Sequence, residues 1–196
     1  IYIKNVCVLI NTMRILIANR ALSALKFVTS IKEWLRKEPT VKLTLIGLVT
    51  EEDMDSGYKY IELLDEVVMC GNGIYMDGPK IVEVCLKKHI EAVWPGWGYL
   101  SERSDFVELL ENNNIKFIGP NSTTIKQVGD KIESMKLAEK ANAPLIPWSG
   151  GCIENKEEAL LKGKQIGFPL MIKAADGGGG RGIRRVNEEK DMKTLL

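Results

Sequence analysis

A run of glycines near the end of the chain, Gly177-Gly178-Gly179-Gly180-Arg181-Gly182, is the feature with the clearest chemistry. Glycines leave successive backbone amides accessible and free to take positive φ values. Such a loop can surround phosphate oxygens with N–H donors, and Arg181 adds a charge and fork-shaped donors. The run therefore predicts a phosphate-binding loop.

The context of the glycine run decides between this interpretation and a flexible surface linker. Glycine linkers usually carry serine and lie between domains, whereas this run lies between two predicted strands, 168–174 and 183–186. It is not a P-loop, because GxxxxGK[ST] is absent. It does not match the dinucleotide fingerprint, because a strand follows it instead of a helix. A strand–loop–strand hairpin that folds over a nucleotide as a lid fits the pattern.

Two lysines are candidates for contacts with the same anion. Lys173 lies at the end of an apolar strand just before the glycines, on the face opposite the strand's apolar residues. A lysine there needs an anionic partner or solvent, and beside the glycine run we favour phosphate. Lys131 lies in the first turn of a helix, where the macrodipole disfavours cations. A bound anion would offset that cost, but Asp130 and Glu133 can also neutralise Lys131, and spacing alone favours the second explanation.

A third segment, WPGWGYLSE at residues 94–102, follows a predicted strand at the carboxyl edge of a sheet. Open α/β sheets bind ligands at this edge. Two tryptophans around Pro-Gly make a stiff turn with large apolar surfaces, and packing between two domains is favoured over direct ligand contact. His89, the only histidine, is expected to be exposed and structural.

Short apolar runs alternate with longer amphipathic ones and position these segments. Asn19 is expected to cap the first helix. The alternation implies right-handed crossovers and a doubly wound α/β fold with a parallel sheet. The predicted strands are 14–18, 41–49, 66–70, 92–94 and 116–118, and the predicted helices are 21–36, 56–64, 79–88 and 105–112.

The character of the chain changes after Gly119-Pro120. A polar stretch opens a new helical region, and helices over 130–141 and 155–165 precede the hairpin, with a last helix after Asn187. Asp130 and Glu133 have the spacing of a capping box. We therefore expect one domain over 14–120 and the beginning of a second over 121–196.

Composition excludes several classes of protein. Lys+Arg total 27 and Asp+Glu total 26 among 196 residues, and this balance argues against a nucleic-acid binder. The four cysteines lie far apart, so neither a zinc site nor a disulfide framework is expected, and a reducing compartment is indicated. No apolar run approaches the ~18 residues of a membrane span. We expect a cytoplasmic protein without a membrane partner, a plastid being the alternative location.

Several segments, in their order along the chain, resemble the biotin carboxylase component of biotin-dependent carboxylases. The tryptophans at 94 and 97 and the PWSG turn look most like the large multidomain acetyl-CoA carboxylases of eukaryotes. Ala21 stands where the family usually has glycine. The matching segments are ILIANR (15–20), WPGWGYLSE (94–102), FIGP (117–120), GDK (129–131), PWSG (147–150), MIKA (171–174) and GGGGRGIR (177–184).

The resemblance implies a Rossmann-like domain that precedes ATP-grasp, followed by the start of an ATP-grasp domain. It implies that ATP, with Mg²⁺, activates bicarbonate as carboxyphosphate, and that the carboxyl group passes to biotin on a biotinyl carrier domain. By position, Lys131 and Lys173 would contact ATP. The lid over its phosphates would consist of Gly177, Gly178, Gly179, Gly180, Arg181 and Gly182.

The same resemblance places the metal ligands and the catalytic residues beyond Leu196. Residues 1–196 alone are therefore expected not to carboxylate biotin, and a homo-oligomer is implied for the full-length protein. Two alternatives stay open. One is another ATP-grasp ligase, either a propionyl-CoA or pyruvate carboxylase or an enzyme like carbamoyl-phosphate synthetase, the last disfavoured by the segment at 94–98. The other is a non-catalytic nucleotide-binding module.

Overall fold

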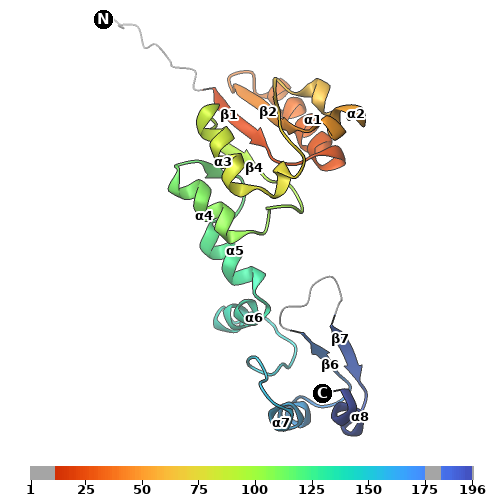
Figure 1. Cartoon of the computed structure of the whole chain (residues 1–196). Coiled ribbons are helices and arrows are strands. Elements are labelled where there is room, and N and C mark those ends of the chain that lie inside the picture. Colours follow the sequence, from red (N-terminus) through yellow and green to blue (C-terminus); the bar gives the residue numbers. More distant parts are fainter. Residues whose placement is uncertain (1–11, 175–181, 196) are drawn as a thin grey trace, which may run out of the picture. The chain divides into compact units, whose positions relative to one another are not determined.

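The structure is a computed structural model that describes residues 12–174 and 182–195, without the side chains of 193–195 (Figure 1). It divides into two compact units, Ile1–Lys126 and Gln127–Leu196. Most of the glycine run, from Gly177 to Arg181, lies outside the described residues. No helix in the described part of the chain is long and apolar enough to cross a membrane.

The first unit is built on a five-stranded sheet in the order β3-β2-β1-β4-β5, and every neighbouring pair is parallel. The register places Ile15 beside Leu45 and Ala92. The strands are β1 (Met13–Ile17), β2 (Leu43–Val49), β3 (Glu66–Met69), β4 (Ala92–Trp94) and β5 (Lys116–Phe117). The predicted α/β fold with a parallel sheet is confirmed.

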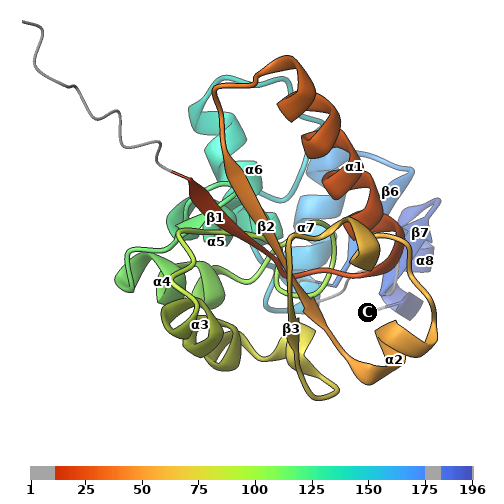
Figure 2. The ribbon, with the colours of Figure 1, turned by 90° about the horizontal axis from the view of Figure 1, so that it is seen from above.

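Helices cover both faces of this sheet, as Figure 2 shows. Alternate residues of β1 point to opposite sides, so Ile15 and Ile17 join the core under α1, while Leu16 joins the core under α3 and α4. Each such side chain contributes about 1.5–3 kcal/mol on full burial. The helical segments are α1 (Ala21–Lys37), α2 (Glu51–Asp55), η1 (Ile61–Leu63), η2 (Ile74–Met76), α3 (Gly78–Lys87) and α4 (Ser104–Asn112).

One predicted helix, 56–64, is wrong. The helix begins earlier, at Glu51, because Thr50 caps it and forms a reciprocal capping box with Asp53. The chain then turns through Gly57, whose φ is +61°, and only the short η1 follows. The spacing of Thr50 and Asp53 in the sequence is that of a capping box and indicates a helix that begins at Glu51.

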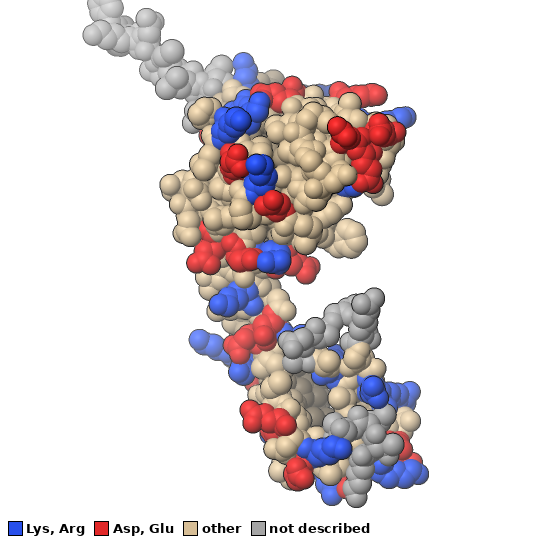
Figure 3. All heavy atoms as spheres, viewed as in Figure 1, with Lys and Arg blue, Asp and Glu red and all other residues tan. Residues whose placement is uncertain are grey.

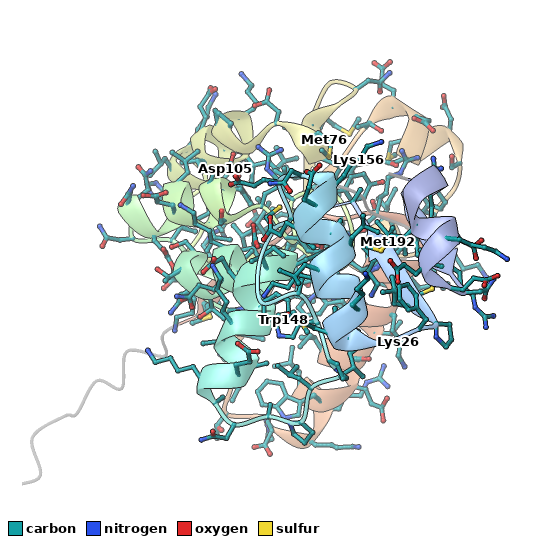
Figure 4. The ribbon with its side chains drawn as sticks, turned by 90° about the horizontal axis from the view of Figure 1, so that it is seen from below. Lys26, Met76, Asp105, Trp148, Lys156 and Met192 are labelled. Carbon is teal, nitrogen blue, oxygen red and sulfur yellow. The ribbon has the colours of Figure 1, made fainter. Side chains whose placement is uncertain are left out.

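The second unit packs helices on one face of a two-stranded antiparallel hairpin. Ala159 of α7, Val186 of β7 and Met192 of α8 form its buried core, and Figure 4 shows Met192 pointing toward α7. A Cβ on Gly163 would lie 2.8 Å from Met192 Sδ, so glycine permits this close approach. The elements are α5 (Ser122–Gly129), which spans the division, α6 (Lys131–Lys140), α7 (Lys156–Ile166), β6 (Leu170–Lys173), β7 (Ile183–Val186) and α8 (Glu189–Leu195).

Asp130 caps α6, but it does not form the reciprocal capping box with Glu133 that their spacing suggested. Asp130 Oδ1 accepts hydrogen bonds from the backbone N–H of Ile132 and of Glu133, both at 2.8 Å. The Glu133 carboxylate binds Lys136 Nζ at 2.9 Å. Charges of both signs are interspersed over the face seen in Figure 3, in keeping with the net charge of +1.

Candidate functional site

The hairpin of the second unit has one covered and one exposed face. Leu170 and Ile172 are half-buried, whereas Met171 and Lys173 are exposed. This alternation confirms the predicted orientation of Lys173. Directly opposite residues of an antiparallel pair share a face, and the register pairs Lys173 with Ile183. The exposed face therefore presents a cation next to apolar side chains.

Lys131 reaches the end of this hairpin from the start of α6. Its Nζ lies 3.5 Å from the carbonyl oxygen of Ala174, the residue that follows Lys173. Ala174 in turn donates its N–H to the carbonyl oxygen of Gly182 at 3.0 Å. The structure thus brings Lys131 to the point where the two strands meet the glycine run, which spacing alone did not favour.

Gly182 closes the hairpin and is the one member of the run whose geometry is described. Its φ is +72°, and a Cβ there would lie 2.8 Å from the Cβ of Ala174. Both the backbone conformation and the close approach therefore require glycine. The predicted roles of Gly177, Gly178, Gly179, Gly180 and Arg181 fall on residues outside the described part of the chain.

The chemistry available at this end of the hairpin suits a polyanion. Lys131 Nζ and the exposed Lys173 supply positive charge at this end of the hairpin, and the exposed apolar side chains of Met171 and Ile183 lie on the same face as Lys173. Among the residues that the structure describes, no group of three or more His, Cys, Asp or Glu could hold a metal ion.

A groove in the second unit is a separate feature. It has a volume of about 610 Å³ and lies between α6, the segment before α7, and α7 itself. Trp148 lines it and donates its Nε1–H to Glu139 Oε1 at 2.7 Å. None of Lys131, Lys173 and Gly182 lines this groove, so we place the candidate site at the hairpin.

Asn19 lies at the carboxyl edge of the first unit's sheet. It was expected to cap α1, but it does not. Arg20 is the N-cap residue of α1 and makes no side-chain capping bond. The Asn19 amide instead donates to the carbonyl oxygens of Pro95 at 2.7 Å and Trp97 at 2.9 Å. Its own oxygen accepts from Arg20 N–H, so the side chain is already satisfied and ties the loop after β1 to the loop after β4.

An ion pair with a fully buried carboxylate lies beside Asn19, and sequence reasoning missed it. Arg20 Nε lies 2.6 Å from Oδ1 of the fully buried Asp53. Tyr75 Oη lies 2.7 Å from Asp53 Oδ2, which also accepts from Thr50. The hydrogen bond to Glu52 raises the pKa of Arg20, so the guanidinium stays charged. Arg20 and Asp53 therefore join the segments that follow β1 and β2, and Tyr75 in η2 adds the segment that follows β3.

The tyrosines around this ion pair stay neutral at physiological pH. Burial, followed by the hydrogen bond to Asp53, raises the pKa of Tyr75. Burial raises the pKa of Tyr60 to about 12. Both hydroxyls therefore stay protonated near pH 7, and Tyr75 donates hydrogen bonds to Asp53 and to the Leu48 carbonyl oxygen.

The two tryptophans of the 94–102 segment have different surroundings. Trp94 stacks on Phe27 of α1, with ring centroids 4.1 Å apart and an interplanar angle of 13°. Trp97 is 83% exposed. His89 is exposed, as expected. Trp94 therefore packs against a residue of the first unit.

Ala21 occupies a backbone conformation that favours glycine, with φ at +52°. A left-handed conformation costs an alanine about 1–2 kcal/mol, partly offset by the greater freedom of an unfolded glycine. We expect Ala21→Gly to raise the free energy of unfolding by up to about 1 kcal/mol. Urea denaturation of the two chains would check this, and a loss of stability would contradict it.

A known protein family matches each of the two units. The family model described as "Biotin carboxylase, N-terminal domain" matches residues 11–125. A second, described as "Carbamoyl-phosphate synthase L chain, ATP binding domain", matches residues 130–196. The chain belongs to the biotin carboxylase family. The resemblance drawn from the sequence segments is confirmed.

Solved biotin carboxylases share the fold. The chain is 35% identical to biotin carboxylase from Campylobacter jejuni, with a TM-score of 0.81 over 95% of this chain and 41% of that one. The chain is 33% identical to the biotin carboxylase domain of 2-oxoglutarate carboxylase from Hydrogenobacter thermophilus, with a TM-score of 0.78. The match covers 92% of this chain and 39% of that one.

Curated relatives include acetyl-CoA carboxylases. Acetyl-CoA carboxylase 1 from Oryza sativa is 34% identical over 93% of this chain. The chain spans 9% of the length of that relative.

Proposed function

We propose that this chain is the first part of the biotin carboxylase domain of an acetyl-CoA carboxylase. The whole protein would carboxylate biotin with bicarbonate at the expense of ATP and so feed malonyl-CoA and fatty-acid synthesis. Support comes from the acetyl-CoA carboxylases among its relatives and from the tryptophans at 94 and 97. The relative from Hydrogenobacter thermophilus was crystallised as a dimer with MgADP and bicarbonate, which supports the same ligands and a homo-oligomer here.

The convergence of two lysines on one end of the hairpin carries the proposal. Lys131 Nζ reaches the carbonyl oxygen of Ala174, next to Lys173 and to the strand ends that hold the glycine run. In the proposed site both lysines contact the ATP phosphates. Gly177, Gly178, Gly179, Gly180, Arg181 and Gly182 cover them as a lid. The proposed domains are 14–120 and 121–196.

These groups suit the chemical problem of the reaction. Bicarbonate is a poor electrophile, and transfer of the γ-phosphoryl group to it supplies a leaving group. Negative charge develops on the transferred group, so fixed ammonium groups and loop amides lower the barrier. Biotin then accepts the carboxyl group.

Lys173→Met in the full-length enzyme tests the proposal. A charge-assisted contact contributes about 1.5–3 kcal/mol, so we expect KM for ATP to rise or kcat to fall at least tenfold. Lys156→Met is the matched control, because Lys156 is exposed on α7 of the same unit (Figure 4) and lies outside the proposed site. Unchanged ATP kinetics in Lys173→Met would contradict the assignment.

The family model of the second unit supports one other candidate. It takes its description from a carbamoyl-phosphate synthase chain, so another ATP-grasp ligase is the second candidate. An assay of the full-length protein separates the two. Biotin-stimulated ADP formation with bicarbonate supports the carboxylase, whereas ammonia-dependent carbamoyl phosphate formation supports the alternative.

A further inference from the structure

One residue, Asp130, separates α5 from α6 and fixes where α6 begins. Its backbone is extended, with φ at −81° and ψ at 124°. Its Oδ1 accepts hydrogen bonds from the N–H groups of Ile132 and Glu133, both at 2.8 Å. These are two of the donors that a helix leaves unsatisfied in its first turn. The protein itself thus occupies these donors, and what α6 offers at this end is the side chain of Lys131.

Lys131 is the first residue of α6 and directly follows the cap. In an α-helix every Cα–Cβ bond tilts toward the amino end, so a side chain at the first position extends past the start of the helix. Lys131 does so, since its Nζ lies 3.5 Å from the carbonyl oxygen of Ala174, the residue after β6. The place of this ammonium group therefore depends on whether the first turn of α6 is formed.

Tertiary packing does little to hold that first turn. None of the ten residues of α6, all of which the structure describes, is buried. Helices in proteins are stabilised mainly by packing of an apolar face, so a helix without buried residues depends more on its cap. The carboxylate of Glu133 is engaged along the helix instead, where it pairs with Lys136 Nζ at 2.9 Å. Asp130 is therefore the side chain that holds the turn from which Lys131 projects.

We propose that Asp130 is a positioning residue for Lys131. By capping α6 it holds the Lys131 ammonium group at the end of β6 before the nucleotide binds. This rests on the proposed function and adds to it a residue that does not touch the nucleotide. A contact that is ordered in advance favours binding, because the ligand does not have to order it. Without the cap, part of the binding free energy would go into forming the first turn of α6.

The test measures KM for ATP and kcat of the full-length enzyme carrying Asp130→Ala, Asp130→Asn or Asn155→Ala. We expect Asp130→Ala to raise KM about three- to tenfold, the range to which loss of a cap corresponds, with kcat little changed. Asparagine caps helices as well as aspartate does, so Asp130→Asn should keep KM at or below the wild-type value. Asn155→Ala is the matched control, because Asn155 caps α7 of the same unit and accepts from Glu158 N–H at 2.8 Å. It should lower the thermal stability as Asp130→Ala does, without raising KM.

A second comparison combines Asp130→Ala with Lys131→Met. Lys131→Met alone should raise KM for ATP at least as much as Asp130→Ala does. Adding Asp130→Ala to Lys131→Met should then raise KM no further, because the group that Asp130 positions is gone. Additive effects of the two substitutions would overturn the inference, since Asp130 would then act independently of Lys131.

Three other results would also overturn it. These are an unchanged KM in Asp130→Ala, an equal rise in Asn155→Ala, which would indicate a general loss of stability, and an equal rise in Asp130→Asn, which would assign the effect to the charge instead of the cap. If Lys131→Met raises KM and Asp130→Ala does not, the proposed function stands and only the positioning role fails. If Lys131→Met leaves KM unchanged, the proposed contact of Lys131 with ATP fails, and the positioning role fails with it.

Discussion

Asp53→Ala is expected to lower the free energy of unfolding of the first unit by about 3–5 kcal/mol, the cost of breaking a buried ion pair from one side. Asp53 is fully buried, and its carboxylate faces Arg20 Nε at 2.6 Å and Tyr75 Oη at 2.7 Å. The alanine would leave Arg20 with the exposed Glu52 as its remaining carboxylate, would take away the carboxylate to which Tyr75 donates, and would remove the capping box with Thr50. Urea denaturation followed by tryptophan fluorescence would measure the loss.

Glu52→Ala is the matched control for this prediction. Glu52 also pairs with Arg20, at 3.2 Å, but its side chain is 64% exposed. An exposed pair of this kind contributes about 0–1 kcal/mol. Similar losses for Glu52→Ala and Asp53→Ala would show that burial of the pair does not determine its contribution.

Gly96→Ala is expected to cost about 2–4 kcal/mol of stability, because two penalties combine at one residue. Gly96 has φ at +65°, a conformation that L side chains rarely adopt. A Cβ there would lie 2.7 Å from Asn19 Nδ2 and 2.7 Å from Trp94 Cη2. Neither neighbour moves freely, since Asn19 holds two loop carbonyls and Trp94 stacks on Phe27.

Gly98 provides the comparison within the same loop. Its φ is +76°, but a Cβ there would meet nothing within 4 Å. Gly98→Ala should therefore show only the conformational cost, about 1–2 kcal/mol. Thermal and urea denaturation of both variants would separate strain from steric conflict. The explanation fails if the two substitutions destabilise the unit equally.

Local patterns were sufficient to predict most of the fold. The strand at 92–94 and the strand at 183–186 have the predicted bounds, because each is a short run bounded by polar or turn residues. The prediction of a helix at 56–64 was wrong because it did not take account of the Thr50 cap, which starts the helix at Glu51. The prediction that Asn19 caps α1 was wrong because its side chain makes tertiary contacts instead. The carbonyl groups that it binds belong to residues more than 70 positions away.

The candidate site was only partly accessible from sequence. Strand alternation was enough to orient Lys173. Lys131 required the tertiary structure, because its contact with Ala174 joins residues 43 positions apart. Arg20, Asp53 and Tyr75 come from segments that follow three different strands, so no local spacing in the sequence predicts their cluster.

The bonds made by Asn19, Arg20 and Tyr75 have a consequence for protein engineering. They connect the segments that follow β1, β2, β3 and β4, because Asn19 binds the Pro95 carbonyl oxygen while Arg20 and Tyr75 both contact Asp53. A graft of the tryptophan-rich loop alone into another scaffold would leave its carbonyls without the amide that fixes their direction. To keep the shape of the loop, a graft must include all four of these segments together.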